Sequence, residues 1–244
     1  MAYEGLSNLH LLAEADNYNA WLFDAIRPYV GKRVLEIGAG IGTFTALLGE
    51  LGHVTATDID EACLAELSSR FFRFGNVGVM RLDITDIGRE QSEMLRKKDF
   101  DTIIGLNVLE HIEDDILALK NLRLLVAFGR LLLIVPALRI LYGVEDKAVG
   151  HIRRYEKPEL VEKLSKAGWH VEKIGYLNSL GAVLWFIKNR IMKSPATSPG
   201  NVRIYDKLIV PFLSRLERTI PAPFGQSLVA ISSTAECMSG SERG

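Results

Sequence analysis

The feature that most constrains the fold of this chain is a glycine-rich turn near its beginning. The apolar run 33–37 stops at Gly38, Gly40 and Gly42 follow at alternate positions, and residues 43–51 then show helical periodicity. Glycines allow a tight turn that a ligand can approach closely, and the helix that follows adds the positive end of its dipole. The sequence therefore predicts a strand, a ligand-binding loop and a helix.

The rest of the chain alternates between strand and helix patterns. Helical periodicity covers residues 7–29, where one or two helices are expected. Further strands are expected at 53–57, 77–82, 100–106, 130–135, 169–174 and 227–232, and helices at 61–72, 113–127 and 158–167. This alternation predicts an α/β, Rossmann-like fold, doubly wound, with a mostly parallel seven-stranded sheet and helices on both faces.

The chain is expected to form one domain with appendages, because 244 residues with 48% apolar content can bury one sizeable core. The expected parts are an N-terminal helical lid at 1–30, the ligand-binding core at 31–176, a helical insertion at 177–226, the last core strand at 227–233 and a disordered tail at 234–244. The tail is assigned to disorder because its residues are small, polar and charged.

Charge and cysteine content argue against several classes of protein. With 29 basic and 30 acidic residues the formal net charge is -1, so no overall positive field attracts nucleic acid, and no such partner is expected. Cys63 and Cys237 lie far apart, with neither the paired spacing of a zinc site nor the density of a disulfide scaffold. We therefore expect no metal site and a reducing compartment.

Neither export nor membrane insertion is indicated. The first residues lack the basic start and compact apolar stretch that a signal peptide needs. The most apolar late segment, 177–187, is interrupted by Asn178, Ser179 and Gly181 and is shorter than the ~20 residues needed to cross a bilayer. The expected location is the cytoplasm.

The polar residues around the glycine turn indicate the kind of ligand. Glu36 stands two residues before Gly38, and Asp58 closes the next strand twenty residues after Gly38, where Rossmann-like sites hold ribose hydroxyls. A nicotinamide-dinucleotide fingerprint would place its third glycine at position 43, where Thr43 stands. The spacing therefore favours a different nucleotide-like ligand.

Several stretches resemble one family. VLEIGAGIGTFTALL resembles the first motif of class I S-adenosylmethionine-dependent methyltransferases. RLDITD around Asp83, the segment 100–112 and the segment 129–136 resemble later motifs, and GHIRRY at 150–155 resembles a stretch of a bacterial small-molecule methyltransferase subgroup. The resemblance covers roughly residues 17–176 in order. It implies S-adenosyl-L-methionine as the cofactor.

The resemblance also implies roles for single residues. Glu36 would face the methionyl ammonium group, Asn107 would offer it a carbonyl, and Asp58 would hold the ribose. The residues expected to contact the cofactor are Tyr18, Glu36, Gly38, Ala39, Gly40, Asp58, Ile59, Asp83, Ile84 and Asn107. Taken singly, Asp83 could cap a turn and Asp58 could be a solvated strand end. Their joint position at the ends of successive strands favours the cofactor.

The acceptor side offers two histidines as candidate catalytic residues. His111 follows the fourth strand and His151 follows the fifth, and imidazole is suited to remove a proton from a hydroxyl near neutral pH. A structural role is the alternative for each, since the arginines of 150–155 could tie that loop to nearby carboxylates. Glu110 is interpreted as a helix-start carboxylate. A neutral acceptor nitrogen would need no base.

The insertion carries a broad apolar helical face between residues 177 and 191, with Lys188, Arg190 and Lys193 at its end. Such faces usually pack on the domain. The alternatives are an apolar acceptor channel or contact of 177–193 with a membrane surface, because flanking basic residues favour anionic lipid. The oligomeric state is left open.

These features predict an S-adenosylmethionine-dependent methyltransferase that acts on a small-molecule acceptor, such as a lipid, a glycan or a secondary metabolite. The sequence does not distinguish O- from N- or C-methylation. One alternative is a non-catalytic S-adenosylmethionine-binding or regulatory protein. An NAD-dependent oxidoreductase is disfavoured by the loop spacing and by the absence of a recognisable catalytic dyad.

Overall fold

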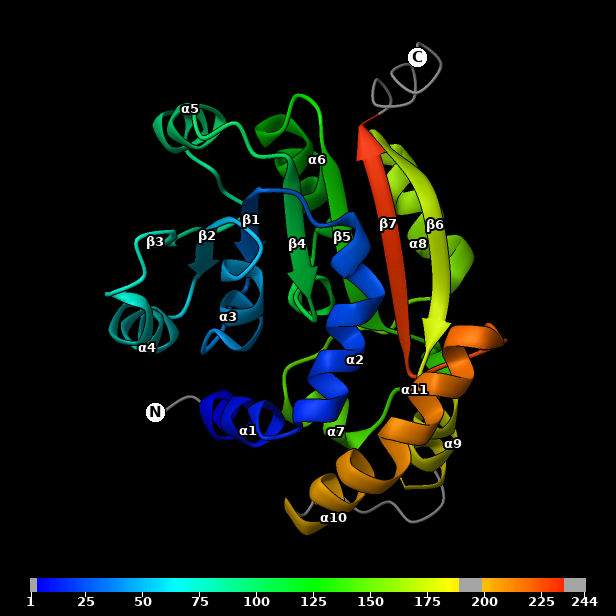
Figure 1. Ribbon diagram of the computed structural model, residues 1–244. Coiled ribbons are helices and arrows are strands. Elements are labelled where there is room, and N and C mark those ends of the chain that lie inside the picture. Colours follow the sequence, from blue (N-terminus) through cyan, green and yellow to red (C-terminus); the bar gives the residue numbers. More distant parts are fainter. Residues whose placement is uncertain (1–3, 189–198, 235–244) are drawn as a thin grey trace.

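A seven-stranded sheet forms the centre of the molecule. The computed structural model describes residues 4–188 and 199–234, and the order of its strands is β3-β2-β1-β4-β5-β7-β6 (Figure 1). The strands are β1 (Arg33–Ile37), β2 (His53–Asp58), β3 (Val77–Arg81), β4 (Thr102–Leu106), β5 (Arg130–Pro136), β6 (Trp169–Leu177) and β7 (Ser227–Thr234). The first five pair in parallel, whereas β7 runs antiparallel to both β5 and β6. The expected mostly parallel, doubly wound sheet is confirmed.

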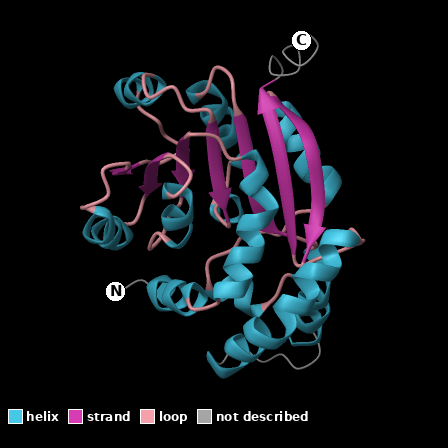
Figure 2. Cartoon of the chain, viewed as in Figure 1, coloured by secondary structure: helices cyan, strands magenta, loops and turns pink. Residues whose placement is uncertain are grey.

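Helices cover both faces of this sheet (Figure 2). On one face, α2 (Asp16–Ile26), α3 (Thr43–Gly49) and α4 (Glu61–Phe71) contribute to a single apolar cluster. On the other face, α5 (Arg89–Arg96), α6 (Asp115–Leu125) and α8 (Lys157–Lys166) contribute to a second. The remaining elements are α1 (Glu4–Ala13), η1 (Arg27–Tyr29), η2 (Leu109–His111), η3 (Arg139–Leu141), α7 (Val144–Ala148), α9 (Ser179–Phe186), α10 (Pro199–Ile204), the π-helix η5 (Tyr205–Ile209) and α11 (Val210–Thr219).

The central strands are buried on both sides, which explains their continuous apolar sequences. In β4, Ile103 belongs to the cluster under α6 and its neighbour Ile104 to the cluster under α2. In β5, Leu131 and Leu132 divide in the same way. Alternate residues of a strand point to opposite faces, so a parallel strand between two helical layers needs apolar residues at every position.

One helix on the α6 face was not expected from the sequence. The segment REQSEMLR forms α5, whose only buried residue is Leu95. Its residues are strongly polar on average, with Met94 and Leu95 as the only apolar side chains, so it lacks the repeated apolar residues that predict the other helices.

The segment between β6 and β7 folds into helices, at the place of the expected insertion. Its π-helical turn is tied to α2, because the Asp206 carboxylate accepts the Tyr18 amide at 2.8 Å and the Asn17 side chain at 3.1 Å. Val210 of α11 packs with Trp21 of α2 in a small third cluster. The division of the chain into these parts stays a prediction. Thr234, the first residue of the predicted tail, is instead the buried last residue of β7, and the rest of the tail lies outside the described residues.

The apolar face expected on the insertion is present on α9, where Leu180, Val183 and Leu184 are exposed. Lys188 at its end forms an ion pair with Glu145 of α7, whereas residues 190 and 193 lie outside the described part. Within that part, no helix combines the length and the apolar character that crossing a membrane requires. Lipid contact through 177–193 stays a prediction.

The tight packing at the centre of the sheet can be tested with two glycines in strands. A Cβ added to Gly105 of β4 would lie 2.9 Å from Cδ1 of Ile37 and 3.2 Å from Cδ2 of Leu133, so Gly105→Ala should lower the free energy of unfolding by about 1–3 kcal/mol. A Cβ on Gly78 of β3 would meet only the Val54 carbonyl oxygen, at 4.0 Å. Gly78→Ala is the matched control and should leave stability unchanged or slightly higher. Urea unfolding measures both, and equal losses would contradict this account.

Candidate functional site

The glycine loop after β1 has a backbone shape that needs its glycines. Gly38, Gly40 and Gly42 have φ angles of 61°, 56° and 83°, in the left-handed region. A Cβ on Gly38 would collide with the Val108 side chain, just beyond β4, and one on Gly42 would collide with the Phe71 ring of α4. The loop is therefore packed between the end of β4 and α4.

Asp58 at the end of β2 holds this loop in place. One oxygen of its carboxylate, Oδ2, accepts the Gly40 amide at 2.8 Å, and Oδ1 accepts the amides of Ile59 at 2.8 Å and Asp60 at 3.0 Å. A carboxylate can accept about four hydrogen bonds, so capacity remains for a ribose hydroxyl. The residue predicted to bind the ribose thus also shapes the loop.

Glu36 lies beneath the loop and is almost completely buried. Its exposed fraction is 3%, and its Oε2 accepts a hydrogen bond from the Thr45 hydroxyl of α3 at 2.6 Å. Burial raises the pKa of Glu36 to about 8, and the nearby charge of Asp58 adds to this rise. A cation such as an ammonium group would compensate the cost of ionising Glu36 here, but this contact stays a prediction.

The other predicted cofactor residues lie after β2, β3 and β4. The Ile59 side chain is exposed and that of Ile84 is buried. Asp83 accepts hydrogen bonds from the Thr85 side chain at 2.7 Å and amide at 2.9 Å, which lower its pKa; it therefore caps a turn, as the alternative interpretation held. Asn107 is exposed and left-handed, with a φ of 55°.

The N-terminal helices approach the loop through a different residue from the one predicted. Tyr18 is half-buried against Trp21, and its hydroxyl hydrogen-bonds with Ser227 and Asn178, at the β6–β7 side of the sheet. The side chain that reaches the loop is Leu9 of α1, 3.4 Å from where a Cβ on Gly40 would lie. A leucine in a helical pattern gives no signal of such a contact, so the sequence could not identify it.

The segment after β5 brings His151 next to His111. The Ile152 amide donates to the Glu110 carbonyl at 3.0 Å, and the two imidazole ring centres lie 4.8 Å apart. His151 Nδ1 is 3.0 Å from Asp146 Oδ1, and His111 Nδ1 is 3.1 Å from the Gly150 carbonyl oxygen. The structure therefore joins the two predicted catalytic histidines, which are forty residues apart in the sequence.

The arginines and tyrosine that follow His151 anchor the segment. Arg153 binds Asp115 of α6 at 2.7 Å, and Tyr155 donates its hydroxyl to the same carboxylate at 2.7 Å. The buried Arg154 donates Nε to Asp146 at 2.9 Å. A cavity of about 360 Å³ beside them is lined by these two arginines, Arg139, Tyr142, Ile152 and Glu159. Because the arginines are paired with carboxylates, they tie the loop down, as one of the two interpretations held.

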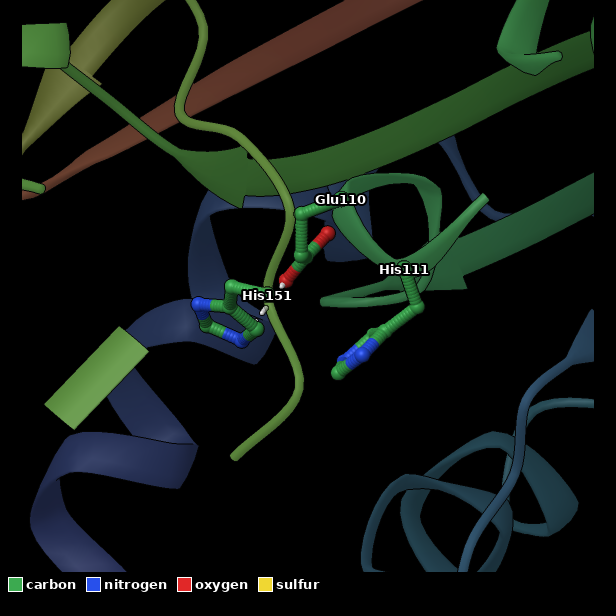
Figure 3. Close-up of side chains that lie close together, drawn as sticks. All are labelled: Glu110, His111 and His151. Carbon is green, nitrogen blue, oxygen red and sulfur yellow. Dashed lines mark ion pairs between the residues drawn. The ribbon is translucent and has the colours of Figure 1, made fainter. Parts of the chain in front are cut away.

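Glu110 is the residue that the sequence interpretation missed. It lies inside η2 with an exposed fraction of 0%, and its Oε1 is 3.6 Å from His151 Nε2. Figure 3 shows its carboxylate directed toward His151, with the His111 ring on the other side. Neither carboxylate oxygen has a hydrogen-bond partner among the described residues, and burial raises the pKa of Glu110 to about 8. Glu110 does stand in the first turn of η2, as expected, but the sequence did not indicate that its carboxylate is buried.

The raised pKa of Glu36 predicts how stability depends on pH. A folded-state pKa of about 8, against 4.5 ordinarily, means that the folded chain holds this proton more tightly than the unfolded chain. The stabilisation is complete below about pH 4.5 and is lost as the pH rises to about 8. Glu36→Gln removes this titration and keeps an acceptor for Thr45.

Thermal or urea unfolding at pH 5 to pH 9 compares the two proteins. The wild type should lose more stability than Glu36→Gln across this range, since titration of Glu110 contributes equally to both and cancels in the difference. Parallel stability curves would contradict the assignment.

Comparison with known proteins agrees with this geometry. A family model described as a methyltransferase domain matches residues 35–129. An uncharacterised methyltransferase of Mycobacterium bovis is 33% identical over 132 residues, which are 50% of this chain and 61% of that protein. The chain spans less than two thirds of the length of the curated relatives that it matches.

Two solved structures share the fold. An S-adenosylmethionine-dependent methyltransferase from Mesorhizobium loti has a TM-score of 0.59 and 14% identity, covering 87% of this chain and 97% of that one. Magnesium protoporphyrin IX methyltransferase from Synechocystis, crystallised with S-adenosylmethionine, has a TM-score of 0.52 and 18% identity, covering 93% and 80%. The chain therefore contains a match to a methyltransferase domain and shares its fold with S-adenosylmethionine-dependent methyltransferases.

Proposed function

We propose that this chain transfers the methyl group of S-adenosylmethionine to a small-molecule acceptor that binds beside the C-terminal ends of β4 and β5. The observation that carries the proposal is the meeting of two groups of residues at one edge of the sheet. Gly38 of the glycine loop packs against Val108, which directly follows Asn107 in the sequence. Two residues later the chain reaches Glu110, which forms a group with His111 and His151. The predicted cofactor site and the predicted acceptor site are therefore adjacent.

The residues of the loop fit the cofactor. A Cβ on Gly40 would lie near only the Leu9 side chain, at 3.4 Å and 3.6 Å, so the outer face of the loop is covered by one flexible side chain and not by backbone. Asp58 would accept the ribose hydroxyls and Glu36 would pair with the ammonium group. Both carboxylates are positioned by β1 and β2, whose ends lie side by side.

Methyl transfer does not require the protein to form a covalent bond with either substrate. The sulfonium group of the cofactor already activates the carbon, so the chain has to align the acceptor atom and exclude water. Catalytic roles for His111 and His151 stay predictions, and the acceptor is proposed from their position beside the cofactor site. A lipid, a glycan and a secondary metabolite all remain candidate acceptors, and a non-catalytic binding protein is the competing function.

Cofactor binding is tested with Asp58→Ala. Loss of a charged acceptor, and of the bond that holds the Gly40 amide, should weaken S-adenosylmethionine binding by about 1.5–3 kcal/mol, or roughly 10- to 150-fold. Asp86→Ala, an exposed aspartate beyond β3, is the control and should keep the wild-type affinity. Isothermal titration measures both. Unchanged affinity in a folded Asp58 variant would contradict the assignment of the site.

Transfer itself is tested with methyl-labelled cofactor and cell extract separated into small molecules, lipids, proteins and nucleic acids. Label should appear in the small-molecule or lipid fraction, because a net charge of -1 provides no general attraction for nucleic acid. Cofactor binding without transfer to any fraction would favour the non-catalytic alternative. Label confined to protein or nucleic acid would refute the proposed acceptor class.

A further inference from the structure

The two histidines beside Glu110 have fixed orientations. A carbonyl oxygen can only accept a hydrogen bond, so the contact of His111 Nδ1 with the Gly150 carbonyl places the proton on Nδ1. Asp146 does the same for His151 Nδ1, because its Oδ1 lies 3.0 Å from this nitrogen. In each neutral ring the lone pair is therefore on Nε2. This arrangement is typical of histidines that bind a metal through Nε2.

Glu110 adds a third electron-pair donor to the same place. Its carboxylate is completely buried, its Oε1 lies 3.6 Å from His151 Nε2, and neither oxygen is hydrogen-bonded to a described residue. The positive charge of Arg154 lies close to this carboxylate, but its Nε donates a hydrogen bond to Asp146 instead. A buried carboxylate that accepts no hydrogen bond is costly, and two Nε2 lone pairs cannot donate hydrogen bonds to it.

We infer that Glu110, His111 and His151 bind one divalent transition-metal ion, of which Zn²⁺ fits best. Their ligand atoms lie within 4.8 Å of one another (Figure 3). Metal–ligand bonds of about 2.1 Å allow at most about 4.2 Å between two ligand atoms, so only modest rotation of side chains is required. Two imidazoles and one carboxylate form a ligand set of catalytic zinc sites, whereas Mg²⁺ and Ca²⁺ prefer oxygen ligands.

The metal ion would add a role to the proposed methyl transfer, and this part of the inference rests on the proposed function. Three protein ligands leave a coordination position open for an acceptor hydroxyl, whose proton passes more readily to water when the oxygen is bound to a cation. The acceptor oxygen then forms a bond to the methyl carbon, and the carbon–sulfur electron pair moves to sulfur, which leaves as a neutral thioether. His151 is a metal ligand in this scheme, and the favoured acceptor is a hydroxyl compound.

The expectation of no metal site rested on the cysteines, and the ligands found here include none. Glu110 and His111 follow β4, whereas His151 follows β5. Spacing along the chain gives no metal signature, because the packing of the loop after β5 on η2 creates the site.

The test measures metal directly on the untagged full chain after treatment with a chelator. Titration with Co²⁺ should give a visible absorption band that saturates at one ion per chain, and dialysis against Zn²⁺ followed by elemental analysis should give the same ratio. His111→Gln should weaken binding at least 10-fold. His170→Gln is the control, because His170 is an exposed histidine of β6 far from the site in sequence, and it should bind as the wild type does.

Glu110→Gln should also weaken binding at least 10-fold, and thermal unfolding shows whether this buried variant folds. If it does not, His111→Gln decides, since His111 lies at the surface. A wild type that binds neither ion at one equivalent, or a folded His111 variant that binds as tightly as the wild type, would overturn the inference. Isothermal titration with S-adenosylmethionine is run separately on the same samples. Loss of cofactor binding would count against the proposed function and leave the metal result intact.

Discussion

The parallel pairing of β1 with β2 and β4 is the constraint on which the rest of the site depends. It sets Ile37 of β1 beside Thr57 of β2 and Gly105 of β4, so all three strands end at one edge of the sheet. Backbone turns after these strands then deliver the glycine loop, Asp58 and Asn107 to that edge. The lack of a side chain at Gly105 allows Ile37 and β5 to pack closely there. A shift in this alignment would separate the glycine loop, Asp58 and Asn107 from one another.

The parts of the fold that the sequence predicts are those determined by residues close together in the chain. The sequence predicts the glycine loop and the position of Asp58 because each is indicated by nearby residues. These are the glycines at alternate positions, the apolar run before them and the carboxylate at the end of a strand. The contact of Leu9 with the loop and the burial of Glu110 arise from chain segments that are distant in sequence. The segment that forms α5 has only two apolar residues, Met94 and Leu95, and so lacks the apolar content by which the other helices are predicted.

In the segment after β5, one buried carboxylate contacts both the arginine interpreted as an anchor and the histidine predicted to be catalytic. Asp146 accepts hydrogen bonds from His151 and from Arg154, so the same oxygen serves both the anchoring of the loop and the orientation of the imidazole. The sequence left acceptor contact and anchoring as alternatives, because a motif of adjacent residues does not reveal the partner that they share. In the folded chain the arginine fixes the loop and the histidine is left with one ring nitrogen free of Asp146.

The bonds between the N-terminal helices and the helices before β7 have a mechanical consequence. Leu9 covers the glycine loop, while the Tyr18 amide is held by Asp206 and Glu14 is paired with Arg203 at 2.8 Å. Ion pairs of exposed groups such as Glu14 and Arg203 weaken in salt, whereas the hydrogen bond to Asp206 is mostly shielded from solvent. Opening the loop by moving α1 and α2 together therefore either breaks these links or carries the helices before β7 along. The helix that covers the predicted cofactor loop is thus followed by one that is bonded to a part of the chain almost two hundred residues away in sequence.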